Sequence, residues 1–259
     1  HDIAGTADRA SDGCIIAQSN DEIARRAKVI GLSLPTIETN RQVVREIAKA
    51  GVAGTVVVDT CTIGIDAAKL NAQILNEVGI QYLDSPVSGL KFRAEEGALV
   101  SMVSGAASEL KKARKLLEGY SRAVVHVGTE PGQGQRMKVL NNAICIASYV
   151  ISSEALTYGE AGGLKVREML EVINESSGQN FATKFLFPKY VATEQYDASG
   201  AEAHIIEKDI SLFVDGANGE GTPSKAITAA YDVIKAFKDA DPLQDQMNIY
   251  PYVRGLHKD

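Results

Sequence analysis

The sequence lacks three features that would place it at once in a functional class: paired cysteines, an excess of basic residues and a long apolar run. Its three cysteines form no CxxC pair and show no zinc-ligand spacing with the four histidines. We therefore expect no metal site and a reduced, cytoplasmic setting. The net charge of −6 gives no support for nucleic acid or an anionic membrane as a partner. No apolar run reaches about 18 residues, so we predict no membrane-spanning segment.

The composition that remains is sufficient for a sizeable core. The chain has 259 residues, of which 45% are apolar and 23% are charged. These values are typical of a soluble globular protein with one large domain or two ordinary ones.

The first half of the chain alternates short apolar runs with helical patterns of about a dozen residues. Val29–Leu34 and Thr55–Asp59 are almost entirely apolar, as in strands that are buried on both faces. Such alternation predicts parallel strand–helix–strand units in an α/β sheet. The predicted strands are 13–17, 29–34, 55–59, 80–84, 99–105 and 123–127, and the predicted helices are 19–27, 39–50, 66–78 and 108–119.

After Gly134 the pattern becomes helical throughout. The sequence therefore predicts an α/β sheet domain over residues 1–134 and an all-helical domain over residues 135–259, which begins with a long interdomain helix. The predicted helices of this second domain are about 135–160, 166–176, 182–192, 202–217 and 222–238, followed by a less regular segment over 239–259.

The turns that follow parallel strands lie at the edge of the sheet where α/β proteins bind ligands. Here those turns contain Pro35-Thr36, Cys61-Thr62 and Ser85–Gly89. In the last of them, the hydroxyl of a serine and exposed backbone N–H groups could hold a carboxylate. An ordinary strand-ending turn has the same composition, so this motif alone does not decide between the two interpretations.

The stretch Gly132–Asn142 combines a glycine turn with the start of the long helix. Lys138 and Asn142 are four residues apart, so they share one face of the helix about one turn apart. An amine that can titrate, next to an amide that can donate and accept hydrogen bonds, suits proton transfer to or from a hydroxyl oxygen. The pair is a weak signal by itself, because most helical lysines are solvated surface residues.

Several motifs follow one another in a specific order and spacing, namely Asp84–Gly89, Gly97, Met102–Gly105, His126–Gly128, Gly132–Gly134, Lys138, Asn141-Asn142, Ser176–Gly178 and Lys208–Ile210. This order resembles the β-hydroxyacid dehydrogenases, the family of 3-hydroxyisobutyrate dehydrogenase. The resemblance covers about residues 10 to 240. It implies a Rossmann-like sheet domain, NAD or NADP as cofactor and a small carboxylate as substrate.

The resemblance also implies roles for individual residues. Lys138 matches the catalytic lysine of the family, and Asn142 matches its partner. Ser88, Gly89 and Asn141 match substrate-binding positions. The residues that match cofactor-binding positions are Leu34, Pro35, Thr62 and Lys208. The related 6-phosphogluconate dehydrogenases favour histidine where this chain has Asn141, and they have a much longer helical domain, so that branch fits less well.

The substrate loop departs from the family pattern. The family continues Ser-Gly-Gly, whereas here Leu90 follows Gly89 and Lys91 comes next. A leucine in place of glycine would narrow the site or shift its backbone, and Lys91 could add a second contact to an anion. The identity of the hydroxyacid is therefore left open.

A second departure concerns the glycine-rich turn that cradles the cofactor pyrophosphate. No Gly-x-Gly-x-x-Gly pattern occurs before Gly31, and the chain begins with His1 rather than methionine. A dinucleotide-binding unit of about 30 residues would have to precede His1. We therefore expect the sheet domain to be incomplete at its N-terminus, and this chain as written to bind the cofactor weakly and show little activity.

These roles together give a mechanistic hypothesis. Ser88 and the Gly89 backbone hold the substrate carboxylate, Lys138 takes the hydroxyl proton as hydride leaves the carbinol carbon, and Asn142 orients the oxygen or the lysine. The rival hypothesis is a non-catalytic Rossmann-like binding or assembly protein, which the missing glycine turn and Leu90 favour. The apolar helix that starts near Met137 also predicts a homo-oligomer.

Overall fold

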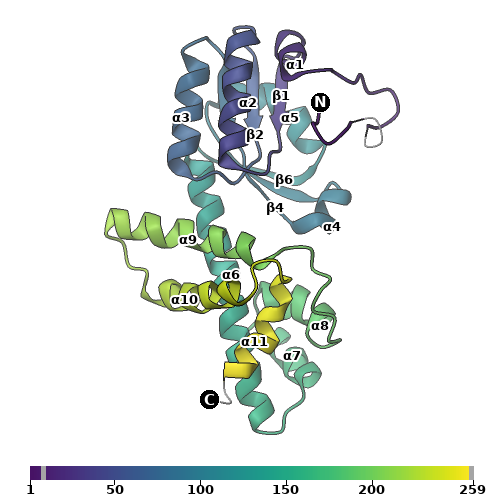
Figure 1. Cartoon of the computed structure of the whole chain (residues 1–259), viewed down its shortest axis with the longest axis vertical. Coiled ribbons are helices and arrows are strands. Elements are labelled where there is room, and N and C mark those ends of the chain that lie inside the picture. The colour runs from purple at the N-terminus through teal and green to yellow at the C-terminus, as the bar shows by residue number, and fades with distance from the viewer. Residues whose placement is uncertain (7–9, 257–259) are drawn as a thin grey trace. The chain divides into compact units, whose positions relative to one another are not determined.

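A computed structural model describes residues 1–6 and 10–256 of the chain (Figure 1). The chain divides into two compact units, His1–Lys138 and Val139–Asp259. Helix α6, Gln133–Ala161, starts in the first unit and continues into the second. The two units are described separately below.

The first unit is built on a six-stranded mixed sheet in the order β1-β2-β3-β5-β4, with β6 paired to β5. β1, β2 and β3 are parallel to one another, and β5 and β6 are parallel to each other. The strands are β1 Val29–Leu32, β2 Val56–Asp59, β3 Gln81–Asp84, β4 Val87–Ser88, β5 Leu99–Ser104 and β6 Ser121–Gly128.

The predicted parallel strand–helix–strand units are present at β1–β3, but the connection from β3 to β5 is not one of them, because β5 runs antiparallel to β3 and β4. The segment between β3 and β5 holds the two-residue strand β4 and the six-residue helix α4, Leu90–Glu95. A parallel connection needs a crossover that carries the chain back along the whole sheet, which is usually a longer helix. Because α4 is too short for that, the chain returns beside β3 in the opposite direction.

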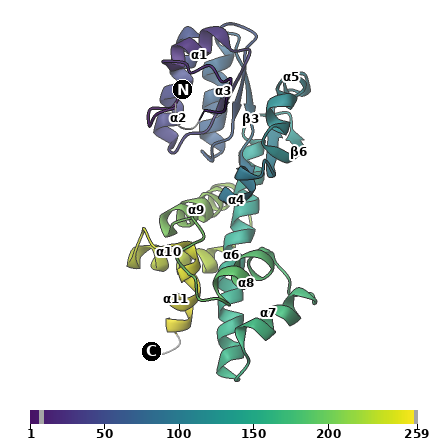
Figure 2. The same ribbon diagram turned by 90° about the vertical axis from the view of Figure 1, so that its right-hand side faces the viewer.

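Helices cover both faces of this sheet (Figure 2). The apolar faces of α1, Asn20–Arg26, α2, Ile37–Ala50, and α3, Ile65–Asn76, form one buried cluster with β1–β3. α5, Ala107–Glu118, covers the other face and packs on β1, β2 and β3. The side chains of Ser19 and Thr36 cap the first turns of α1 and α2 by accepting hydrogen bonds from backbone N–H groups.

The predicted strand at 13–17 was wrong. These residues belong to no strand, and the Ile15 side chain is 77% exposed. A short apolar run becomes a strand only where a neighbouring strand can pair with its backbone groups. No strand in the described part of the chain pairs with this run, so its isoleucines stay at the surface.

The second unit is helical, as predicted, and contains two features that the sequence did not indicate. The predicted helix at 182–192 is a π-helical turn, η1 Ala182–Leu186, followed by the short helix α8, Phe187–Tyr190. The segment after residue 239 contains a short 3₁₀ turn and the helix α11. The remaining elements are α7 Val166–Asn174, α9 Ala203–Glu220, α10 Lys225–Ala240, η2 Gln246–Asn248 and α11 Ile249–Gly255.

Aromatic side chains hold the centre of this helical unit. Phe187 of α8 and Tyr250 of α11 are both fully buried, and their rings meet edge to face with centroids 6.3 Å apart. Such ring pairs are worth about 0.5–1.5 kcal/mol beyond the area that they bury. The contact joins α11 to α8, which gives the C-terminal segment its order.

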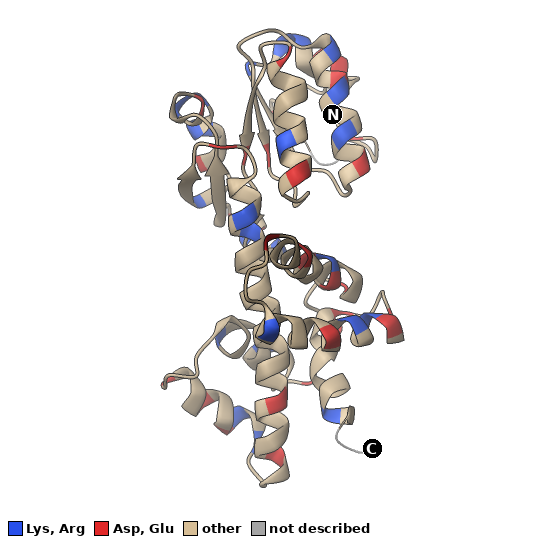
Figure 3. Ribbon diagram, turned by 90° about the vertical axis from the view of Figure 1, so that its left-hand side faces the viewer, with Lys and Arg blue, Asp and Glu red and all other residues tan. Residues whose placement is uncertain are grey.

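Among the described residues, α6 is the one helix that is long and apolar enough to cross a membrane, and half of its most apolar window is buried inside the protein. A core helix of a globular protein has the same length and composition. Figure 3 shows few charged residues along the middle of α6.

Candidate functional site

The start of α6 lies against the carboxyl ends of the strands. The backbone N–H of Gln135 donates to Oδ2 of Asp84, 2.9 Å away, and the N–H of Gly134 donates to Oγ of Ser104, 3.0 Å away. The first N–H groups of a helix have no partner within the helix, and a carboxylate there also faces the positive end of its dipole. A Cβ on Gly134 would lie 2.6 Å from the carbonyl oxygen of Met102, so this close approach requires glycine.

The side chain of Gln135 joins α6 to the turn after β2, which we call the β2 turn, Cys61–Gly64. Its Oε1 accepts from the backbone N–H groups of Ile63 and Gly64, at 2.9 and 3.0 Å. Its Nε2 donates to the carbonyl oxygen of Cys61, at 2.9 Å, and to Oδ1 of Asp84, at 2.7 Å. An amide side chain has two donors and one oxygen that can accept twice, so this fully buried group uses its whole capacity.

Hydrogen bonds also join the β2 turn to the β1 turn, Ser33–Thr36. The N–H of Leu34 donates to Sγ of Cys61, 3.1 Å away, and the hydroxyl of Thr60 donates to the carbonyl oxygen of Leu32, 2.6 Å away. The structure thus brings together two turns that carry predicted cofactor contacts. Pro35 is exposed on the β1 turn and Thr62 is partly exposed on the β2 turn.

A buried carboxylate, Asp59, organises the base of both turns. It accepts from Nδ2 of Asn40 at both oxygens, from the hydroxyl of Tyr82 at 2.9 Å and from the N–H of Cys61 at 3.1 Å. Burial, and next the charge of Asp59, raise the pKa of the Cys61 thiol to about 12. Cys61 is therefore a protonated structural thiol at neutral pH and not a nucleophile.

The loop after β3, which we call the β3 loop, Ser85–Gly89, carries the predicted carboxylate-binding residues. Ser88 ends β4 and is partly exposed, and Gly89 has a φ of 153°. L side chains rarely adopt this φ, so the backbone conformation at this position favours glycine.

Leu90 has a backbone conformation that glycine favours. Its φ of 61° is in the left-handed region, which is unusual for a bulky side chain. Lys91, the other departure from the family pattern, is largely exposed and lies 3.9 Å from a carboxylate oxygen of Glu95.

The predicted catalytic pair lies on α6. Lys138 is 9% exposed, so it does not extend into bulk solvent. Asn142 follows one turn later; its Nδ2 donates to Oδ2 of Asp209, 2.8 Å away, and its Oδ1 accepts from Nδ2 of Asn141 at 3.3 Å. Nζ of Lys208 lies 2.9 Å from Oδ1 of the same Asp209. Three predicted residues of the second unit are therefore joined around one carboxylate.

Sequence reasoning singled out Lys208-Asp209 as a motif but gave Asp209 no role. Its position, on α9 and far from α6 along the chain, offers no signal of a contact with Asn142. Asp84 and Gln135 were missed in the same way. Each was part of a recognised motif, but the hydrogen bonds between them join segments 51 residues apart.

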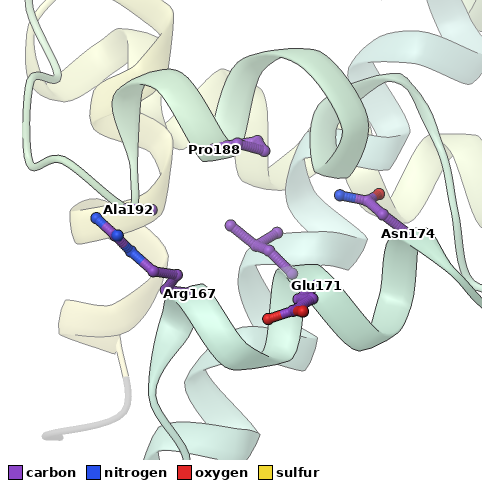
Figure 4. Close-up of a pocket in the computed structure, with 6 residues that line it drawn as sticks. Arg167, Glu171, Asn174, Pro188 and Ala192 are labelled. Carbon is purple, nitrogen blue, oxygen red and sulfur yellow. The ribbon is translucent and has the colours of Figure 1, made fainter.

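A cavity in the second unit is separate from these groups. It has a volume of about 320 Å³ and lies in the second unit, where residues of α7 face α8 (Figure 4). Its lining includes none of the predicted site residues. The lining residues are Arg167, Leu170, Glu171, Asn174, Pro188 and Ala192.

Comparison with known families accounts for almost the whole chain in two parts. Residues 3–128 match the model of the NAD-binding domain of 6-phosphogluconate dehydrogenase. Residues 132–253 match the model described as the NAD-binding domain of NADP-dependent 3-hydroxyisobutyrate dehydrogenase. The chain is also 30% identical over 229 residues to 2-(hydroxymethyl)glutarate dehydrogenase of Eubacterium barkeri, which covers 87% of this chain and 75% of that protein. The chain belongs to the 3-hydroxyisobutyrate dehydrogenase family.

Other members of the family and their structures agree with this assignment. An NAD-dependent L-serine dehydrogenase of Pseudomonas aeruginosa is 34% identical over 174 residues, which are 65% of this chain and 58% of that protein. The structure of Mycobacterium tuberculosis 3-hydroxyisobutyrate dehydrogenase with L-serine aligns with a TM-score of 0.83 and 26% identity, over 92% of this chain and 83% of that one. The predicted fold class, a Rossmann-like sheet domain followed by a helical domain, is confirmed.

We expect the stability of the protein to depend on pH through Asp84, the β3 carboxylate that accepts hydrogen bonds at the start of α6. Burial raises the pKa of Asp84 from 3.8 to about 6, against the hydrogen bonds from Gln135, which lower it. Because the folded state holds this proton more tightly than the unfolded state, the contribution of Asp84 to stability is fully present below about pH 4. It is lost as the pH rises through about 6, and the shift corresponds to about 3 kcal/mol in total.

We therefore expect Asp84→Asn to remove this dependence. The free energy of unfolding of the wild type minus that of the variant, measured by urea denaturation, should fall by about 2 kcal/mol between pH 4 and pH 7. Asp66→Asn, at an exposed position of α3, is the matched control for the change from a carboxylate to an amide. A constant difference for Asp84→Asn would contradict the raised pKa.

Proposed function

We propose that this protein is an NAD(P)-dependent dehydrogenase of a small β-hydroxyacid, with Lys138 as the acid/base. One observation carries the proposal: Lys138 is largely buried on α6, one turn before an asparagine whose amide is held by Asp209. A lysine base must be neutral when it takes a proton, and a buried position favours the neutral amine. A solvated surface lysine would need neither the buried position nor an asparagine held one turn away.

The residues of the first unit fit the nicotinamide end of the cofactor. Pro35 and Thr62 are accessible on two turns that hydrogen bonds hold together, and Leu34 donates its N–H into that network. Lys208, on the second unit, is a further candidate contact. The sequence contains no Gly-x-Gly-x-x-Gly turn, so the fit concerns the nicotinamide end alone. When bound, the nicotinamide supplies the hydride acceptor.

The protein's own groups would act on the substrate as follows. The hydroxyl of Ser88 and the N–H of Gly89 bind the carboxylate. Nζ of Lys138 takes the hydroxyl proton while the carbinol C–H pair leaves as hydride and a C=O bond forms. Asn142, held by Asp209, orients the hydroxyl oxygen or the amine. The protein positions the substrate and transfers the proton. Lys138 accepts the proton, and the hydride would go to the bound nicotinamide.

Two relatives narrow the class of substrate. The names 2-(hydroxymethyl)glutarate dehydrogenase and L-serine dehydrogenase both denote a carboxylate with a hydroxymethyl group on the neighbouring carbon. We infer that this chain also acts on a β-hydroxyacid with a primary alcohol. Initial rates of NAD⁺ and NADP⁺ reduction with 3-hydroxyisobutyrate, L-serine and 2-(hydroxymethyl)glutarate, in the complete protein, test this inference. Turnover of none of them would reject it.

The rival proposal is a non-catalytic binding or assembly protein. Leu90 favours it, because a bulky side chain in left-handed backbone crowds a loop that is otherwise built for a ligand. Titration of NAD⁺ and NADP⁺ into the complete protein separates the two proposals, and binding of neither would favour the rival. The same titration, carried out on the chain as written, tests the weak cofactor affinity that we expect of it.

We further propose that the second copy of this chain binds along α6. Leu140, Ile144, Ile151 and Tyr158 are exposed, and their spacing places them within about 40° of one another around the helix. Ile144 is 61% exposed and Tyr158 is 84% exposed. A single apolar stripe on one helix is self-complementary under two-fold symmetry, which is the commonest arrangement of oligomers.

We expect Ile144→Glu combined with Ile151→Glu to convert an oligomer into a monomer. The measurement is light scattering after gel filtration, and Leu243→Glu, at another exposed apolar position, should leave the mass unchanged. A wild-type monomer would reject the proposal, and so would recovery of the wild-type protein with lipid vesicles.

We also propose that the protein is cytoplasmic. The exposed free thiol of Cys14 supports this location, because a reducing compartment keeps thiols free.

A further inference from the structure

The hydrogen bonds of Gln135 do more than fix one helix end. Its oxygen holds two successive N–H groups of the β2 turn, and its nitrogen holds the carbonyl of Cys61 at the start of that turn. Three backbone groups on both sides of Thr62 are thus bound to one side chain, which is fully buried. The position of Thr62 is therefore set by α6 as well as by its own strand.

Asp84 links the same side chain to the β3 loop. It is the last residue of β3, and the β3 loop follows it directly. Its two oxygens accept from the backbone N–H and from Nε2 of Gln135, and Oδ2 also accepts from the hydroxyl of Ser104 at 3.2 Å. The buried carboxylate therefore fixes the start of α6 to the strand that leads to Ser88.

The pair lies close along the chain or through hydrogen bonds to three first-unit residues to which we assign roles, without being one of them. Lys138 is three residues after Gln135 on α6, Thr62 lies within the β2 turn, and Ser88 is four residues after Asp84. Neither Asp84 nor Gln135 has any exposed surface, so neither can touch a substrate. Their effect on the reaction would have to act through the residues that they hold.

We propose that Gln135 and Asp84 are a positioning pair that sets the catalytic lysine against the β2 turn and the β3 loop. The proposal rests on the proposed function, because it concerns the geometry of that reaction. A misplacement of reacting groups by about 1 Å can cost about 100-fold in rate. The amide is needed because it donates to a carboxylate and a carbonyl on one side and accepts two N–H groups on the other.

The test uses Gln135→Glu, Asp84→Asn and the combination of the two. Gln135→Glu would place a second carboxylate against Asp84 and would remove both side-chain donors. Asp84→Asn would turn the new amide nitrogen toward Nε2 of Gln135, donor against donor. In the combined variant the new asparagine can again donate to the new glutamate, while its oxygen still accepts the backbone N–H at the start of α6. The carbonyl of Cys61 still lacks its donor in that variant.

In the complete protein we expect each single variant to lower kcat by about 10–100-fold with a change of less than about threefold in the KM of the hydroxyacid. The kcat of the combined variant should be at least about threefold higher than the kcat of Gln135→Glu. Thr55→Val is the matched control, because the hydroxyl of the buried Thr55 donates to the carbonyl oxygen of Ala27, 3.4 Å away, in the same unit but at the amino end of β2, opposite to the β2 turn. It should leave kcat unchanged.

The outcomes are separable from those of the proposed function. If Lys138→Ala abolishes turnover while Gln135→Glu retains wild-type kcat, the positioning pair is rejected and the function stands. If both single variants lose kcat but the combination recovers none, the pairing is also rejected. If Lys138→Ala itself turns over normally, the proposed function is rejected. Thermal unfolding and the quantity of cofactor bound, measured on every variant, correct kcat for any loss of folded protein.

Discussion

Replacement of Lys138 by alanine should lower kcat by about 10³-fold and leave the Kd of the cofactor within about threefold of the wild-type value. General acid–base groups contribute about 10²–10⁴-fold to rates. The amine is the one titratable group that we assign to the hydroxyl proton, whereas we assign the cofactor end to the β1 and β2 turns. Steady-state rates, together with a fluorescence titration of the reduced cofactor, measure the two quantities.

The variant Lys138→Arg distinguishes proton transfer from the simple presence of a positive charge. Arginine keeps the charge but stays protonated in proteins, so it cannot take the hydroxyl proton. We expect Lys138→Arg to lose nearly as much kcat as Lys138→Ala, and Lys49→Ala, at an exposed position of α2, to lose none. If arginine restored turnover, the lysine would serve as an electrostatic contact and not as the base.

The second large effect concerns stability. Asp59→Ala should lower the free energy of unfolding of the first unit by about 3–5 kcal/mol, because the loss of a buried carboxylate leaves buried donors without an acceptor. The donors are the amide of Asn40, the hydroxyl of Tyr82 and the N–H of Cys61. Urea denaturation followed by far-ultraviolet circular dichroism measures the change.

The control for this effect is a carboxylate in the same unit without such partners. Asp66→Ala removes an exposed carboxylate from the first turn of α3, where the interaction with the helix dipole is worth about 0.3–1 kcal/mol. A loss of less than about 1 kcal/mol for Asp59→Ala as well would show that the buried network adds little stability.

The order of elements in the fold could be predicted from local patterns. Val56–Asp59 is buried on both faces of a sheet and reads as a continuous apolar run, and α2 shows its buried residues on one face. The direction of β5 could not be predicted, because it depends on where the short helix α4 ends. Ile15 and Ile16 show a different error: an apolar run that has no neighbouring strand was predicted to be a strand.

The candidate site was predictable only where its residues are neighbours along the chain. Lys138 and Asn142 are separated by one helical turn, so their common face follows from helix geometry. The contact of Gln135 with Ile63 spans 72 residues, and that of Asn142 with Asp209 spans 67. Such contacts depend on tertiary packing, for which a single sequence contains no direct signal. The roles of the individual site residues remain proposals.

The most direct test of the account is a crystal structure of the protein with cofactor and an unreactive analogue of the hydroxyacid. We predict that Nζ of Lys138 lies about 2.6–3.2 Å from the hydroxyl oxygen of the analogue, whose carboxylate contacts Ser88. An analogue bound with its hydroxyl beyond the reach of Lys138, even through a single water molecule, would contradict the assignment of this lysine as the acid/base.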